Sequence, residues 1–233
     1  MIRLSVSDRV GEIRFDRAAE GNAFTGDMVR QMREALNNAT ANADILTLTG
    51  AGADFTIGRD RKEPKSGAPF DAFHGISELN RALAAFPGII VAAVRGRAFG
   101  LGVGLVMRSD IAIAADDARF GLDEVSHGIP PMFIMEAILD HLAPKRALDI
   151  VLSSRAFDAS EALAMGILSR IVAPAALDTT VRDYVKELRS RDRAVLLACK
   201  AYLRKVAPLA PEARSAVALV EQTQFAMTGR HKH

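Results

Sequence analysis

The sequence predicts an α/β fold, and three observations support that prediction. Short apolar runs rich in β-branched residues recur between stretches of helical periodicity. Of the 233 residues, 49% are hydrophobic and 25% are charged, which is typical of a globular protein and excludes a disordered or fibrous chain. From residue 132 onward the pattern is helical alone, so we expect a helical region packed on the α/β core or on a neighbouring subunit.

The first fifty residues predict a β-hairpin, a helix and a third strand. Apolar and polar residues alternate on both sides of Asp8 and Arg9, as expected for two half-buried strands joined by a turn. Asp27 is the expected cap of a helix that buries Met28 and Met32. A β-rich run over 45–49 follows and ends at Gly50.

The middle of the chain predicts a long loop, a helix and several short strands. Residues 50–69 show no steady period, so we expect a loop with one helical turn, and loops of this length are often functional. Apolar residues at helical spacing from 70 to 86 predict a helix that Pro87 and Gly88 end. Strands are then expected at 89–94, 111–114 and 119–121, and a helix is expected from Gly104.

The remaining residues predict helices with recognisable ends. Asp158 and Glu161 have the spacing of a capping box, and Gly166 stands where a left-handed residue ends a helix. Amphipathic stretches at 194–206 and 211–227 predict two helices joined by a tight turn. We therefore expect a core over residues 1–185 and a C-terminal helical region over residues 186–233.

Composition excludes several classes of protein. No apolar run approaches the roughly 18 residues that cross a bilayer, so we expect no membrane span. Cys199 is the only cysteine and cannot form an internal disulfide; with no leader-like start, we expect a reduced, cytoplasmic protein. The formal net charge is +2, and acidic residues are interspersed with basic ones, so nucleic-acid binding is not expected.

Three features of the sequence are candidates for catalysis or ligand binding. Glycines at 96, 100, 102 and 104 precede a helix, where free N–H groups can hold an anion or oxyanion; close backbone packing is an equally good interpretation. Their spacing fits neither a dinucleotide fingerprint nor a P-loop. Glu124 follows a short strand and is either a catalytic or a solvated carboxylate. Gly58 is followed by Arg59, Arg61 and Lys62, which either bind phosphate groups or belong to a solvent-exposed charged loop. No histidine pair at ligand spacing suggests a metal.

These features occur in an order that resembles the crotonase, or enoyl-CoA hydratase/isomerase, superfamily. The similarity runs from Val10 to about residue 205. Its segments include FDR at 15–17 with NAF at 22–24, TGAG at 49–52 with FTIGRD at 55–60, VAAVRGRAFGLGVG at 91–104, SDIAIA at 109–114, ARFG at 118–121, EV at 124–125 with GIP at 128–130, and FDASEA at 157–162 with GILSRIV at 166–172.

The resemblance implies a fold, a ligand and a shared chemistry. The fold is a ββα superhelix followed by helices that build a homotrimer, often paired into a hexamer. The ligand is an acyl-coenzyme A thioester, with coenzyme A as part of the substrate and no permanently bound cofactor. Two backbone N–H groups stabilise the thioester enolate, and their positions here are Arg59 and Leu101. Each such donor contributes about 3–4 kcal/mol to lowering the barrier.

The resemblance also assigns substrate contacts, and it predicts the reaction. Relatives that hydrate a double bond use two glutamates; the first position is Gly104 here, and the second is Glu124. One carboxylate suffices to move a proton between two carbons, so isomerisation is favoured over hydration, which loses roughly 10² to 10⁴ in rate without its second acid–base group. The expected contacts with the substrate, including its coenzyme A part, are Ala23, Ile57, Asp60, Arg61, Lys62, Phe99, Gly102 and Asp123.

Two alternatives stay open at this stage. Another crotonase reaction, such as dehalogenation, decarboxylation or C–C hydrolysis, would use His127, His74 or Asp123. A non-catalytic homologue would bind coenzyme A, or RNA through Arg189 and its neighbours, although their spacing scatters them around a helix. The C-terminal region is shorter than in relatives, so the acyl pocket is expected to be open or covered by a neighbouring subunit.

Overall fold

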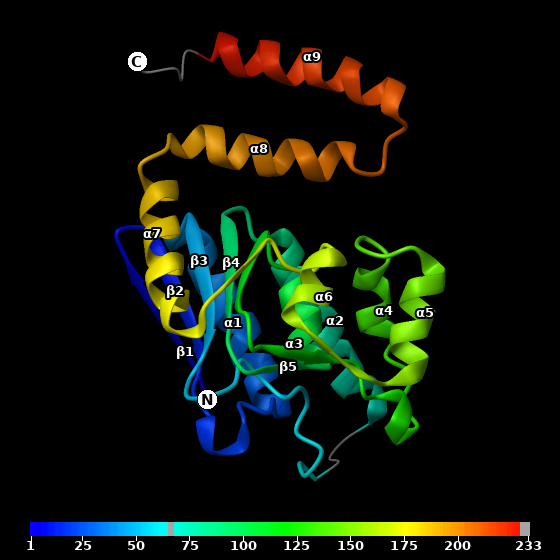
Figure 1. The fold of residues 1–233 in the computed structure, drawn as a ribbon. Coiled ribbons are helices and arrows are strands. Elements are labelled where there is room, and N and C mark those ends of the chain that lie inside the picture. The colour runs from blue at the N-terminus through cyan, green and yellow to red at the C-terminus, as the bar shows by residue number, and fades with distance from the viewer. Residues whose placement is uncertain (65–67, 229–233) are drawn as a thin grey trace. The chain divides into compact units, whose positions relative to one another are not determined.

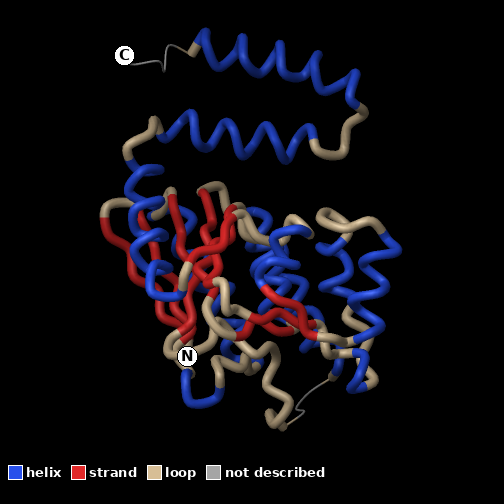
Figure 2. Tube along the Cα trace, in the orientation of Figure 1, coloured by secondary structure: helices blue, strands red, loops and turns tan. Residues whose placement is uncertain are grey.

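The computed structural model describes residues 1–64 and 68–228 and divides into two compact units, Met1–Val185 and Lys186–His233. The first unit contains two β-sheets surrounded by helices (Figure 2). Six strands form the larger sheet, in the order β1 (Ile2–Ser7), β2 (Val10–Phe15), β3 (Ile45–Gly50), β4 (Ile89–Val94), β6 (Ile111–Ala115) and β9 (Arg170–Val172). Three strands form the smaller sheet, in the order β5 (Arg97–Phe99), β7 (Arg119–Gly121) and β8 (Ala156–Asp158).

The expected hairpin and central strands are confirmed. Strands β1 and β2 are antiparallel, and Asp8 and Arg9 make the turn between them with φ values of 47° and 63°. The larger sheet is parallel from β2 onward. Its middle strands are buried on both faces, which explains their nearly continuous apolar sequence.

Two long helices pack against each other beside the larger sheet (Figure 1). Helix α1 (Gly26–Asn42) is capped by Thr25, whose hydroxyl accepts the Met28 N–H, and not by Asp27 as expected. Asp27 lies two residues further along, in the first turn, and pairs with Arg30. Helix α2 (Pro69–Ala85) ends before Pro87 as expected. The loop between β3 and α2 has turns and no helix over 51–64; residues 65–67 lie outside the described residues.

The chain between residues 89 and 138 repeats one unit. Strand β4 joins the larger sheet, β5 joins the smaller sheet, and helix α3 (Leu101–Met107) follows; β6, β7 and helix α4 (Met132–Ile138) repeat this order. This is the expected ββα arrangement. Helix α3 begins at Leu101, one turn before the expected Gly104, because Gly100 makes the turn with a φ of 51°.

The expectation of helices alone after residue 132 is wrong. Strands β8 and β9 each have three residues, which is too short for a two-residue period to stand out in the sequence. Half of the expected capping box is confirmed: the Asp158 carboxylate accepts the Glu161 N–H, whereas the Glu161 carboxylate pairs with Arg155. The helices here are α5 (Pro144–Ser153), α6 (Ala159–Ala164) and α7 (Leu177–Arg189); single 3-10 turns are η1 (Ala18–Glu20), η2 (Val125–His127) and η3 (Pro174–Ala176).

The second unit contains the two expected C-terminal helices, α8 (Arg193–Val206) and α9 (Pro211–Met227). The two helices contact each other, and Lys205 pairs with Glu221 between them. Asp192 caps α8 through the N–H groups of Ala194 and Val195. Among residues 1–64 and 68–228, no helix has the length and hydropathy needed to cross a membrane.

Candidate active site

The segment at Arg59 lies between two others that come from distant parts of the sequence. Arg59 forms a parallel β-bridge with Phe24, in which the Phe24 N–H donates to Gly58 O (2.8 Å) and the Asp60 N–H donates to Phe24 O (2.9 Å). Because the residues on either side of Arg59 make these bonds, its own N–H points to the opposite side. Thr56 forms a second bridge with Ala98, which fixes the segment against β5.

The opposite side is the turn that begins helix α3. Gly58, with a φ of 94°, lies so close to this turn that a Cβ on it would be 2.9 Å from Phe99 O and 3.7 Å from Gly100 Cα. Leu101 is the first residue of the helix, so its N–H has no acceptor within the helix. Within the described part of the chain, neither the Arg59 nor the Leu101 N–H is bonded. Two free donors therefore lie on neighbouring segments.

Glu124 places a carboxylate at the same turn. It follows β7, and its Oε1 lies 2.6 Å from the position that a Cβ on Gly100 would take. Its Oε2 is buried and has no hydrogen-bond partner among the residues that the structure describes. Burial raises the pKa of Glu124 above its ordinary value; the hydrogen bond from its own backbone N–H opposes this with a smaller effect, and the charge of Asp123 adds a still smaller increase. The arrangement suits a proton-transferring group.

Arg61 connects the loop after Gly58 to the loop that carries Glu124. Its Nη2 donates to Asp123 Oδ1 (2.6 Å), and its Nη1 lies 2.7 Å from His127 Nε2. A guanidinium only donates, so Nε2 is the acceptor, and Nδ1 carries its proton toward Asp123 O (2.8 Å). Asp123 and His127 are therefore both engaged in this cluster. His74 lies elsewhere, on α2.

A cleft of about 810 Å³ brings most of the expected substrate contacts together. Seven of the eight line it, and Gly102 does not: it lies in α3, where a Cβ would be 2.8 Å from the Thr56 side chain. The cleft has further cationic residues. Arg17 lines it and pairs with Asp60 (2.7 Å), and Arg97 lines it and is held by Asp54 (2.6 Å).

Arg17 lies in the FDR segment that carries the family resemblance, but the segment predicts no role for its side chain. Arg97 follows Gly96 in the glycine-rich segment at 91–104. The pairing of Arg97 with Asp54 could not be expected, because the two residues are 43 positions apart. The hydrogen bond from Arg97 lowers the pKa of the Asp54 carboxyl below its ordinary value.

Gly104, the position to which the resemblance assigns the first glutamate of hydratases, faces a cation. A Cβ on Gly104 would lie 3.6 Å from Arg108 Nη1 and 3.7 Å from Ile134 Cγ1. Arg108 donates to Phe133 O (2.7 Å), and burial lowers the pKa of its guanidinium. Among the described residues no group of three or more histidines, cysteines or carboxylates could hold a metal ion.

Comparisons with known proteins agree on the family. A family model described as enoyl-CoA hydratase/isomerase matches residues 5–233. A probable enoyl-CoA hydratase of Mycobacterium leprae is 34% identical over 169 residues, or 70% of this chain and 65% of that protein, so the alignment spans about two thirds of the relative. A hydroxycinnamoyl-CoA hydratase-lyase of Pseudomonas fluorescens is 27% identical over 85% of this chain and 76% of its own.

Solved structures show the same fold. An enoyl-CoA hydratase of Mycobacterium smegmatis has a TM-score of 0.90 at 24% identity, over 97% of this chain and 91% of its own. A putative enoyl-CoA hydratase of Thermobifida fusca, solved in complex with CoA, has a TM-score of 0.88 at 25% identity, over 99% and 95%. The chain therefore belongs to the enoyl-CoA hydratase/isomerase family, and the crotonase fold expected from the sequence is confirmed.

Proposed function

We propose that the protein is an acyl-CoA enzyme that moves a carbon–carbon double bond within the acyl chain. The single observation that carries the proposal is the carboxylate of Glu124 at the Gly100 turn, next to the free N–H groups of Arg59 and Leu101. The CoA-bound relative of Thermobifida fusca supports a coenzyme A ligand in the cleft.

The proposed reaction uses one carboxylate twice. Glu124 takes a proton from C2 of a 3-enoyl-CoA, and the electron pair spreads into the thioester carbonyl, whose oxygen accepts hydrogen bonds from the Arg59 and Leu101 N–H groups. The protonated Glu124 then gives its proton to C4, which leaves the double bond between C2 and C3. The raised pKa of Glu124 favours both steps, because it makes the carboxylate a better base and retains the proton between them.

The arrangement at Gly104 argues against hydration as the main reaction. Hydration needs a second acid–base group to hold and deprotonate water, and Gly104 has no side chain. Arg108 lies nearest to that position and is a permanent cation that cannot act as a base. The ring of His127 and the carboxylate of Asp123 are both hydrogen-bonded to Arg61, so Glu124 is the proposed base.

The test is a turnover assay on 3-enoyl-CoA and on 2-enoyl-CoA with wild type, Glu124→Gln and Glu12→Gln. Glu12 is a fair control, because it lies on β2 and accepts a hydrogen bond from Thr49 that a glutamine also accepts. We expect isomerisation to exceed hydration, and Glu124→Gln to lose about 10² to 10⁴ in rate. Unchanged turnover in Glu124→Gln, or hydration faster than isomerisation, would contradict the proposal.

We also propose that the C-terminal unit mediates self-association into a homotrimer or hexamer. Helix α8 is amphipathic, and α9 buries none of its residues against the described part of the chain. Their exposed apolar side chains are Val195, Leu203, Leu219, Val220 and Met227. Light scattering on the full chain measures the mass directly, and a monomer at micromolar concentration would contradict the proposal.

A further inference from the structure

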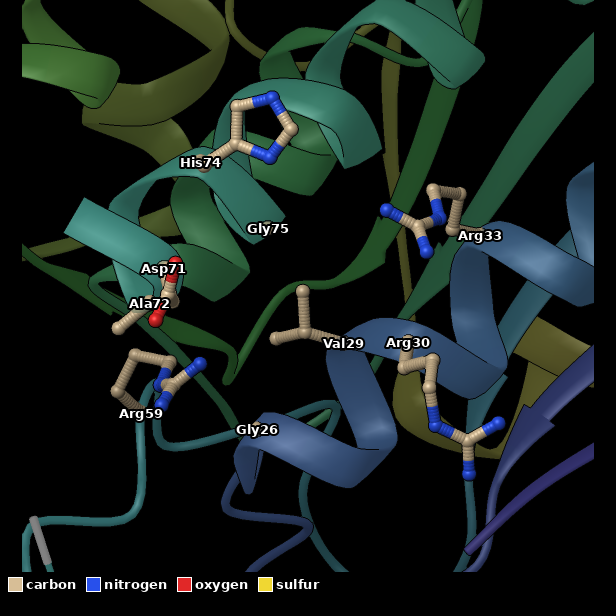
Figure 3. A pocket seen from close by; sticks show the side chains of 9 residues that line it. All are labelled: Gly26, Val29, Arg30, Arg33, Arg59, Asp71, Ala72, His74 and Gly75. Atoms are coloured by element: carbon tan, nitrogen blue, oxygen red, sulfur yellow. The ribbon is translucent and has the colours of Figure 1, made fainter. Parts of the chain in front are cut away.

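A second cavity shares Arg59 with the cleft and lies between helices α1 and α2. Its volume is about 270 Å³. Helix α1 forms one wall and α2 the other, as Figure 3 shows. The lining residues are Gly26, Val29, Arg30 and Arg33 from α1, Asp71, Ala72, His74 and Gly75 from α2, and Arg59 from the loop.

The walls of this cavity carry more positive than negative charge. Three arginines line it, and Asp71 is the only carboxylate among the described lining residues. Arg30 is neutralised outside the cavity, since it pairs with Asp27 and with Glu34 (2.7 Å), and its guanidinium points away in Figure 3. Arg33 is half-buried, points into the cavity, and has no ion pair or hydrogen bond in the described part of the chain.

The side chain of Arg59 enters the same cavity from the opposite side (Figure 3). Its counterion is Glu63, at 3.2 Å from Nη2, and that carboxylate also accepts the Gly26 N–H at 2.8 Å. Burial lowers the pKa of the Arg59 guanidinium despite the nearby carboxylates of Glu63 and Asp60. Glu63 therefore does not offset the full cost of burying this cation.

We propose that the cavity binds a carboxylate at the far end of the acyl chain, held between Arg33 and Arg59. This inference rests on the proposed function and names its substrate class: coenzyme A thioesters of short dicarboxylic acids. Guanidinium groups recognise carboxylates through paired hydrogen bonds, which makes two arginines on facing walls a suitable site. Val29 lies between them and offers an apolar surface to the methylene groups of the chain.

The position of Arg59 explains why the anion is on the acyl chain and not on the nucleotide. Its backbone N–H faces the Gly100 turn, where the thioester carbonyl is proposed to bind, whereas its side chain reaches this cavity. In this proposal the backbone of Arg59 contacts the thioester carbonyl, and its side chain contacts the carboxylate at the other end of the same acyl group. The nucleotide phosphates have cations of their own in the larger cleft, where Arg17, Arg61 and Lys62 lie.

The test compares two thioesters with the same number of acyl carbons, glutaryl-CoA and valeryl-CoA, by titration calorimetry on the full chain. We expect wild type to bind glutaryl-CoA about 10- to 100-fold more tightly. Arg33→Gln should remove this preference and leave the affinity for valeryl-CoA unchanged. The matched control is Arg81→Gln, the same substitution on the other helix, α2, outside the cavity and at a side chain that is 77% exposed; it should keep the preference.

Three results would overturn the inference. Equal affinities of wild type for the two thioesters, with Glu124-dependent turnover intact, would remove the carboxylate site and leave the proposed function standing. A loss in Arg33→Gln that is the same for both thioesters and disappears with their 3′-dephospho forms would assign the cavity to the nucleotide phosphate. Failure of both thioesters to bind would overturn this inference and the proposed function together.

Discussion

Replacing Gly100 with alanine tests the geometry of the site at its most crowded point. The φ of 51° and ψ of −115° at this residue belong to glycine, so a side chain there costs about 1–3 kcal/mol. The new Cβ would also lie 2.6 Å from Glu124 Oε1, so the carboxylate must move away from the turn. A displacement of about 1 Å costs roughly 10² in rate.

Gly104→Ala is the matched control, one helical turn further along α3. A Cβ there meets Arg108 and Ile134 at 3.6 and 3.7 Å, which is ordinary contact, and the helical backbone accepts alanine. We expect a gain of about 0.5–1 kcal/mol and full turnover. Thermal unfolding measures the change in stability, because a change of 1 kcal/mol shifts the melting temperature by about 2–4 °C for a chain of this size. The isomerase assay measures the change in turnover. Full turnover in Gly100→Ala would show that the carboxylate does not act from this position.

Three further predictions follow from the charges near the site. Asp54→Asn should lower the free energy of unfolding by about 1–3 kcal/mol through its bonds to Arg97. Because the pKa of Asp54 is lowered, wild type should lose this contribution as pH falls below about 4. Acid titrations of the variant should lack that loss. The pKa of Glu124 is raised, so the folded state loses stability as pH rises through that pKa. At pH 7 the melting temperature of Glu124→Gln should therefore equal or exceed that of wild type, and a lower one would contradict this. Gly104→Glu should pair with Arg108 and add no hydratase activity on 2-enoyl-CoA, whereas rapid hydration would show that the carboxylate can reach a water.

The sequence predicts elements where periodicity or a cap is strong, and fails where neighbours in space decide. The hairpin, the central strands and the helix capped at Asp158 all follow from local patterns. Thr25 and Asp27 are both good caps two residues apart, and only the bridge at Phe24 places the helix start at Gly26. The three-residue strand β9 exists because β6 offers it a paired edge, which no local pattern records.

The site shows the same division between local and spatial information. The position of Glu124 could be expected from the motif that surrounds it, because the short strand before it and the turn that holds it are neighbours in the sequence. The partners of Arg61 could not, since Asp123 and His127 lie more than sixty positions away. The cavity charge depends on Arg33, which in sequence is one more polar residue on an amphipathic helix.

Arg59 also explains how a family can keep its chemistry while changing its substrate. Every residue except proline has a backbone N–H, so the donor at this position constrains the side chain very little. The β-bridge with Phe24 fixes the direction of that N–H, and the side chain is free to line the neighbouring cavity. Substitutions at residue 59 can therefore alter which acyl group fits without removing the proposed carbonyl contact. A variant Arg59→Gln should accordingly keep the turnover of valeryl-length substrates within about tenfold, because it loses a side-chain contact and keeps both backbone donors.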